Sequence, residues 1–240
     1  MKFEYTEVFN FQGALRGMRN PKESWDKSDS IFHYTVVKNP NTMISDYEEV
    51  DCVNLGPKDI ALAQTLIRAG SEHRKFMRQI FVCVDITAPL YWWKEFDTYK
   101  VGTVANSTST MHKLASTPIT MKCFEMDDFE DITLQQADPF RIGVKCHWNN
   151  LIEDLEDLRK RYNVTKDKRY WKELIRLLPD SWLQKRTVTM NYENLLVMCS
   201  KSQRRNHKLT EWSKAFIEWA RSLPYAMELI FFDELEDKNV

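Results

Sequence analysis

The sequence predicts an α+β fold in which a small antiparallel or mixed sheet is covered by helices. Residues 79–87, QIFVCVDIT, are apolar on both faces, which is typical of a strand buried in a sheet. Residues 57–69 and 148–162 instead carry apolar side chains at helical spacing. Because no internal repeat or low-complexity linker divides the chain, we expect a single domain over residues 1–240.

Prolines and glycines mark where several expected helices begin and end. Pro57 suits the first position of a helix, and Gly70 follows its last turn. Pro89 begins a helix crowded with aromatic side chains, which Gly102 ends. The expected strands are residues 2–9, 32–37, 42–44 and 79–87, the middle two on weak signals. The expected helices are residues 11–19, 57–69, 89–100, 148–162, 167–178, 190–203, 208–222 and 225–232.

The composition argues against several functional classes. The charges nearly cancel, at −1, so the chain lacks a net basic field for nucleic acid, although a local basic patch remains compatible with this balance. No run approaches eighteen apolar residues, and the first residues lack an apolar signal region. The five cysteines are scattered, without metal-ligand spacing. We therefore expect a cytoplasmic protein with no metal, no membrane partner and no nucleic-acid partner.

Residues 103–110, TVANSTST, are small or polar and carry no charge. Such residues make a poor core. Their hydroxyl and backbone N–H groups suit a loop that cradles a ligand, and they equally suit a solvated connector. Composition alone favours the connector, and both interpretations stay open at this point.

A basic cluster covers residues 201–208 at the junction of two expected helices. Guanidinium groups of Arg204 and Arg205 could bind an anionic ligand there through paired hydrogen bonds. The alternative is a basic run that complements the dipole at the end of the preceding helix. Local evidence does not separate the two.

Two stretches, residues 57–112 and 178–224, carry features in an order found in a known protein family. The matching features are the helix end at 66–70, the strand 79–87, Ala88-Pro89, the aromatic run 91–96, Leu178-Pro179, Arg186, Met190-Asn191, Arg204-Arg205, His207 and Glu211. On these residues the chain resembles the flavin-dependent thymidylate synthases, and the expected fold resembles theirs.

The resemblance implies an activity and a set of ligands. In that family FAD carries a one-carbon unit from methylenetetrahydrofolate to C5 of dUMP, NADPH is a co-substrate, and the enzyme is a homotetramer. No side chain acts as nucleophile, so no catalytic residue is implied. The implied substrate-binding residues are Glu95, Lys100, Asn106, Ser107, Thr108, Ser109, Thr110, Arg186, Arg204 and Arg205. The implied cofactor-binding residues are Thr98, Tyr99, Thr103, Asn191 and His207.

The chain departs from the family's pattern at its signature, Arg-His-Arg-x-x-Ser, where residues 98–103 read TYKVGT. Glu193 also stands where a second arginine usually contacts the flavin nucleotide. Three hypotheses therefore stay open. The chain is an active flavoenzyme for a pyrimidine nucleotide, or a homologue that binds a nucleotide or flavin without methyl transfer, or a structural or interaction protein of the same fold.

Overall fold

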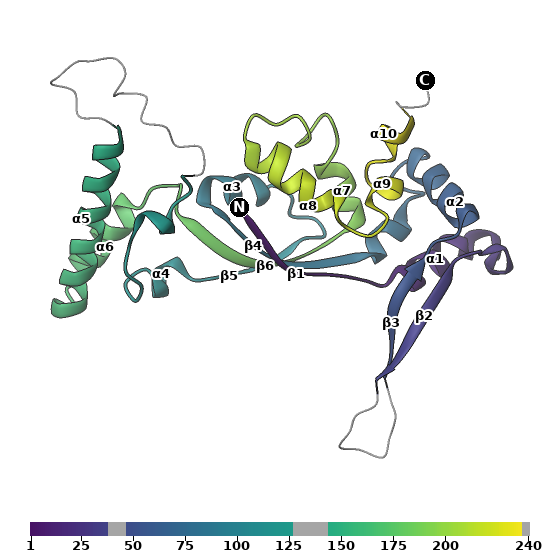
Figure 1. The fold of residues 1–240 in the computed structure, drawn as a ribbon, viewed down its shortest axis with the longest axis horizontal. Coiled ribbons are helices and arrows are strands. Elements are labelled where there is room, and N and C mark those ends of the chain that lie inside the picture. Colours follow the sequence, from purple (N-terminus) through teal and green to yellow (C-terminus); the bar gives the residue numbers. More distant parts are fainter. Residues whose placement is uncertain (38–46, 127–143, 237–240) are drawn as a thin grey trace. The chain divides into compact units, whose positions relative to one another are not determined.

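A computed structural model describes residues 1–37, 47–126 and 144–236 of the chain (Figure 1). A four-stranded sheet has the order β1-β4-β6-β5, with β1 at Lys2–Phe9, β4 at Phe81–Pro89, β6 at Leu183–Asn191 and β5 at Val104–Ser107. A second sheet pairs β2 (Ile31–Val37) with β3 (Tyr47–Asn54) in antiparallel fashion. The α+β prediction is confirmed. The strand expected at 79–87 is β4, whose buried residues alternate along its length.

The chain divides into two compact units. The first contains Met1–Glu4, Asp85–Lys100 and Ala105–Val188. The second contains Tyr5–Val84, Val101–Val104 and Thr189–Val240. We describe each unit by itself, and the single domain over residues 1–240 stays a prediction.

The first unit is built around two packed helices, α5 (Val144–Thr165) and α6 (Lys168–Leu177), which lie side by side in Figure 1. Asp167 begins α6, because its side chain accepts a hydrogen bond from the Arg169 backbone. Pro179 lies just beyond the end of the helix. Under the pair lies an apolar cluster of Leu114, Ile119, Phe124, Leu155 and Leu174. The unit also holds α3 (Leu90–Phe96), α4 (Thr110–Lys113) and a 3₁₀ turn, Met121–Cys123.

The second unit contains a buried ion pair between α1 (Phe11–Arg19) and α2 (Pro57–Arg68). Arg19 Nε lies 2.7 Å from Asp59 Oδ1, and the hydroxyls of Ser28 and Ser30 each donate to Oδ2 at 2.6 Å. Burial acts to raise the pKa of Asp59, but these hydrogen bonds hold it below its usual value. The carboxylate is therefore kept charged inside the unit, where it joins α1, α2 and the segment between them.

The remaining helices of the second unit are short. They are α7 (Tyr192–Met198), a π-helical segment (Glu211–Phe216), α8 (Ile217–Arg221), α9 (Ala226–Leu229) and α10 (Phe232–Glu236). Three 3₁₀ turns, η1 (Asn20–Lys22), η2 (Trp25–Lys27) and η3 (Lys75–Gln79), complete the unit. No described helix is both long and apolar enough to cross a membrane.

Several expected boundaries were wrong. The helix expected over 190–203 begins at Tyr192, because residues 183–191 form β6, which the sequence analysis missed along with β3 and β5. The aromatic helix ends at Phe96 rather than near Gly102. At this helix end the hydroxyl of Thr98 donates to the Glu95 carbonyl at 2.7 Å, so the carbonyl has a side-chain partner. The helix expected over 208–222 is π-helical at first, and that at 225–232 ends at Leu229. The strand signal at 42–44 lies outside the described residues.

Candidate functional site

In the first unit, the side chain of Gln184 on β6 connects two predicted parts of the site. Its Nε2 donates to the Thr108 carbonyl at 3.0 Å and to the Thr110 hydroxyl at 3.3 Å. Its Oε1 accepts a hydrogen bond from Arg186 Nε at 2.9 Å. Gln184 is buried, and a buried amide is stable only when its donors and acceptors are paired. It therefore fixes the segment after β5 against Arg186.

Arg186 is held flat against an aromatic ring. Its guanidinium carbon lies 4.2 Å from the ring centroid of Trp93, whose own Nε1 donates to the Gln184 carbonyl at 3.0 Å. Arg186 Nη1 donates to Asp97 Oδ1 at 2.8 Å. The Arg186 side chain is only 15% exposed, whereas that of Asp97 is 52% exposed. The guanidinium is thus fixed by protein contacts, and its carboxylate partner lies at the solvent side.

The small polar segment 103–110 is not a simple loop. Residues 104–107 form β5, the edge strand beside β6, and the backbone N–H of Thr108 extends the pairing to the Lys185 carbonyl at 2.9 Å. Asn106, Ser107 and Thr108 are exposed, whereas Ser109 and Thr110 are half-buried. The expectation of a loop was wrong for residues 104–107, which form a strand, and ligand binding by residues 106–110 stays a prediction.

Four more of the predicted site residues lie close together in sequence, in the last turn of α3 and directly after it. Glu95 and Tyr99 are half-buried, and Thr98 and Lys100 are exposed. The backbone N–H of Tyr99 donates to the Phe96 carbonyl at 3.0 Å, which closes a tight turn directly after α3. Asp97 lies within this stretch, so the Arg186–Asp97 ion pair connects it to β6.

In the second unit, Asn191 is the N-cap of α7. Its side chain accepts from the Asn194 backbone at 3.0 Å, and the Asn194 side chain accepts from the Asn191 backbone at 3.1 Å. Asn194 Nδ2 also donates to the Val101 carbonyl at 2.7 Å. Gly102 follows with a φ of +80°, and a Cβ there would lie 2.8 Å from Asn191 Nδ2. The turn that leads to Thr103 is therefore packed against the cap.

Arg204 and Arg205 lie in a turn between two helical segments, as the expected helices 190–203 and 208–222 imply. Arg205 donates from Nε to the Cys199 carbonyl at 2.7 Å and from both Nη atoms to Asp233, at 2.8 and 3.1 Å. Arg204 places its guanidinium carbon 4.6 Å from the ring centroid of Trp212. His207 Nδ1 accepts from the Leu209 backbone at 3.2 Å. These contacts shape the turn between α7 and the π-helical segment.

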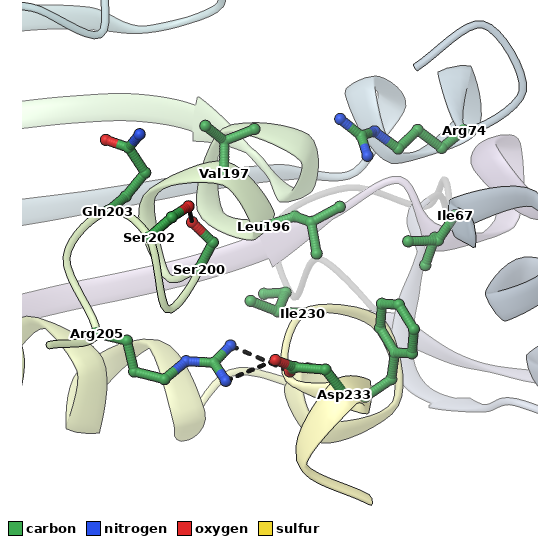
Figure 2. A pocket seen from close by; sticks show the side chains of 11 residues that line it. Ile67, Arg74, Leu196, Val197, Ser200, Ser202, Gln203, Arg205, Ile230 and Asp233 are labelled. Atoms are coloured by element: carbon green, nitrogen blue, oxygen red, sulfur yellow. Dashed lines mark hydrogen bonds and ion pairs between the residues drawn. The ribbon is translucent and has the colours of Figure 1, made fainter. Parts of the chain in front are cut away.

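An open pocket of about 360 Å³ lies beside this turn (Figure 2). The guanidinium of Arg205 points toward Asp233 at its wall, near Leu196 and Ile230. The hydroxyls of Ser200 and Ser202, 3.2 Å apart, also line it. An apolar wall with a few polar groups is typical of a pocket for a small organic molecule.

Glu193, in the first turn of α7, binds two arginines from the 74–79 region. Arg74 Nε lies 2.9 Å from Glu193 Oε1, and Arg78 Nε contacts the other carboxylate oxygen. Burial acts to raise the pKa of Glu193, but the hydrogen bonds from Arg78 and Arg74 keep it below its usual value. The glutamate that replaces an arginine of the resembled family is thus neutralised within the same unit.

The structure brings Thr108, Thr110 and Arg186 together in the first unit through Gln184, which the sequence analysis missed. The sequence signal for this strand is short, because only Val188 and Met190 alternate as apolar residues on the buried face that also holds Gln184. In the second unit, Arg204, Arg205 and His207 share one turn, and Asn191 lies apart as the cap of α7. Among the described residues, no group of His, Cys, Asp or Glu side chains is placed to hold a metal ion.

Comparison with known proteins gives a likeness in fold. Neither a protein-family model nor a curated protein sequence matches the chain. The fold is similar to that of a flavin-dependent thymidylate synthase, ThyX, from Helicobacter pylori complexed with FAD and dUMP. The TM-score is 0.60 at 15% identity, over 97% of this chain and 99% of that chain. A second ThyX structure from the same organism, with FAD and dUMP, gives a TM-score of 0.58 at 15% identity, over 97% of this chain and 98% of that chain. The resemblance stated from sequence is therefore confirmed at the level of the fold.

Proposed function

We propose that the chain binds a pyrimidine nucleotide and FAD, and that it transfers a one-carbon unit to C5 of dUMP or a related pyrimidine nucleotide. The observation that carries the proposal is the likeness in fold, over 97% of this chain, to a protein complexed with FAD and dUMP. The proposed oligomer is a homotetramer, and the proposed co-substrates are NADPH and methylenetetrahydrofolate. Support from individual residues differs between the two units.

The arrangement around Arg186 fits a nucleotide phosphate. Its guanidinium is positioned by Trp93 and Gln184, and its carboxylate partner Asp97 is half exposed. A phosphate can take the place of Asp97, because that side chain can turn into solvent while the guanidinium stays in position. The proposed further contacts come from side chains after α3, in β5 and directly after β5: Lys100, Asn106, Ser107, Thr108, Ser109 and Thr110, with Glu95 facing the base.

The arginines of the second unit fit a ligand unequally. Both Nη atoms of Arg205 bind Asp233, and only 9% of the Arg205 side chain is exposed. We assign Arg205 a structural role and retain Arg204 as the proposed nucleotide ligand. Separating Arg205 from Asp233 would leave a guanidinium that is only 9% exposed without its carboxylate partner, although Asp233 itself is 40% exposed.

The proposed flavin contacts are Thr98, Tyr99, Thr103, Asn191 and His207. Tyr99 supplies a flat, half-buried ring beside which an isoalloxazine could lie. The side-chain oxygen of Asn191 is already used by the α7 cap, so its Nδ2 is the atom that remains for a ligand. Bound flavin supplies the redox chemistry and carries the one-carbon unit, while the residues of this chain bind and orient the two rings.

A second candidate function is nucleotide or flavin binding without methyl transfer. It is favoured by Glu193, which binds Arg74 and Arg78 with its carboxylate where the resembled family has an arginine for the flavin nucleotide. Turnover of dUMP with FAD, NADPH and methylenetetrahydrofolate distinguishes the two candidates. Product formation supports methyl transfer, and dUMP binding without product supports the second candidate.

The nucleotide part of the proposal is tested with Thr108→Asp. A carboxylate beside the proposed phosphate position should weaken dUMP binding by about 2 kcal/mol in calorimetric titration, since a favourable contact is replaced by repulsion. Thr117→Asp is the matched control, because Thr117 is also exposed in the first unit and outside the proposed site. Equal dUMP affinity in both folded variants and the parent would remove Thr108 and the segment directly after β5 from the site.

A further inference from the structure

Positive charge is concentrated at one end of the α5–α6 pair. Residues 159–176 contain eight of the chain's 34 lysines and arginines but only two of its 35 acidic residues. This segment of 18 residues therefore carries +6, and the other 222 residues carry −7. The net charge of −1, on which the expectation of no nucleic-acid partner rested, conceals this separation.

These charges form one surface, which we call the basic tip: Lys160, Arg161, Lys166, Lys168, Arg169, Lys172 and Arg176, all of them exposed. The two helices meet there through the turn at Lys166, and α5 packs against α6. The Arg161 guanidinium lies 6.0 Å from the ring centroid of Tyr170 on α6, so cations of both helices are neighbours.

Three cations of the basic tip, Lys166, Lys168 and Lys172, have no carboxylate partner among the described residues. The arginines are different, since Arg161 pairs with Asp157 at 2.6 Å and Arg169 with Asp167 at 2.6 Å. An exposed pair of this kind contributes little to the stability of a fold. The three lysines form no such pair among the described residues, so ion pairing within the fold does not account for their concentration.

The chemistry of the basic tip fits a phosphate backbone with bases beside it. Lys168 and Lys172 are separated by four residues, about 6 Å along the helix axis. The rings of Tyr162 and Tyr170 lie among the cations and are half-buried, with Lys166 Nζ 5.7 Å from the Tyr162 centroid. Cations that follow a backbone, interleaved with aromatic rings, are the usual means of binding single strands.

The same helices exclude the way in which an amphipathic helix binds a lipid surface. Such a helix inserts its apolar face among the acyl chains. Here the apolar face of α6 is used by the protein, because Leu174 is fully buried in the cluster with Leu155 and Phe124. The exposed residues of α6 are charged except for Leu177 at its end, which is too little apolar surface for such insertion.

We propose that the basic tip binds single-stranded nucleic acid. The surface is separate from the residues assigned to dUMP and FAD, so the inference goes beyond the proposed function and does not depend on it. Its lysines contact the phosphates, and the rings of Tyr162 and Tyr170 stack with bases that a duplex would keep paired.

The test is the anisotropy of a labelled oligothymidylate titrated with the full chain between about 50 and 200 mM salt. The variant replaces Lys166, Lys168 and Lys172 with glutamine, which breaks no ion pair among the described residues. Each phosphate contact to a single strand contributes about −0.7 to the slope of log K against log salt concentration, so the variant's slope should be less negative by about 2. The double variant Lys168→Gln/Lys172→Gln should change it by about 1.4.

The matched control replaces Lys22, Lys27 and Lys58, three exposed lysines of the second unit, with glutamine. It removes the same charge and should leave the slope at the parent value. An unchanged slope in the basic-tip variants, or an equal loss in the control, overturns the proposal. Binding of the parent to anionic phosphatidylserine vesicles but not to the oligonucleotide overturns it as well. A duplex bound more tightly than the single strand contradicts the stacking role of the tyrosines.

Discussion

Replacing Gln184 with leucine should destabilise the protein and weaken nucleotide binding together. Leucine fills a similar volume but can neither accept from Arg186 nor donate to Thr108. The hydrogen bond to the charged arginine contributes about 2 kcal/mol and the neutral bond to the carbonyl about 1, so the loss should be about 3 kcal/mol. For a chain of this length that lowers the melting temperature by about 6–12 °C.

Urea unfolding followed by tryptophan fluorescence measures this loss. Trp93 is a suitable probe, because it packs against Arg186 and donates to the backbone carbonyl of residue 184, a bond that the substitution retains. Gln184→Glu is the matched control. It keeps an acceptor for Arg186 and loses only the donor, so it should lose less stability than the leucine variant. A leucine variant within about 0.5 kcal/mol of the parent would show that Gln184 does not hold the cluster.

Three further predictions concern single contacts. Gly102→Ala should lower the free energy of unfolding, measured with urea, by on the order of 3 kcal/mol, because its Cβ would meet the α7 cap. Gly70→Ala should lower it by on the order of 1 kcal/mol, because Gly70 has a φ of +104° but open space around it. Arg159 hydrogen bonds lower the pKa of Glu156 from 4.5 to about 2. The stabilisation from that pair should be complete above pH 4.5, disappear as the pH falls toward 2, and be absent from Glu156→Gln. Arg205→Met should lower the unfolding free energy by about 2 kcal/mol with unchanged dUMP affinity, whereas Arg204→Met should lose dUMP binding and little stability. The first of these predictions would be contradicted if Gly70→Ala lost as much stability as Gly102→Ala. The second would be contradicted if the effect of Glu156→Gln on stability did not depend on pH, and the third if Arg205→Met lost dUMP binding.

The sequence predicted elements whose signal is local. β4 was evident because both of its faces are apolar, and α2 because Pro57 and a glycine frame it. β5 was missed because its four residues are all exposed, so no apolar alternation marks it. It forms where the edge of β6 offers backbone partners, which is a tertiary effect that local propensity does not contain. β6 was missed because Gln184 and Arg186 stand on its inner face and interrupt the apolar pattern.

The candidate site was predictable to a similar degree. The hydroxyl-rich residues 107–110 and Arg186 were chosen by resemblance, and the structure does place Thr108, Thr110 and Arg186 around one side chain. The partners of the arginines were not predictable. Asp97 and Asp233 belong to no motif, and they meet Arg186 and Arg205 only through folding. Pairing of this kind holds both guanidinium groups in position within the fold.

The most direct test of the proposed function is a titration of the purified chain with FAD, followed by flavin fluorescence and absorbance, in the absence and presence of dUMP. The proposal predicts saturable FAD binding that perturbs the flavin spectrum, with a further change when dUMP is added. FAD that stays spectroscopically free at every protein concentration, with and without dUMP, would contradict it and leave the likeness to thymidylate synthase as one of fold alone.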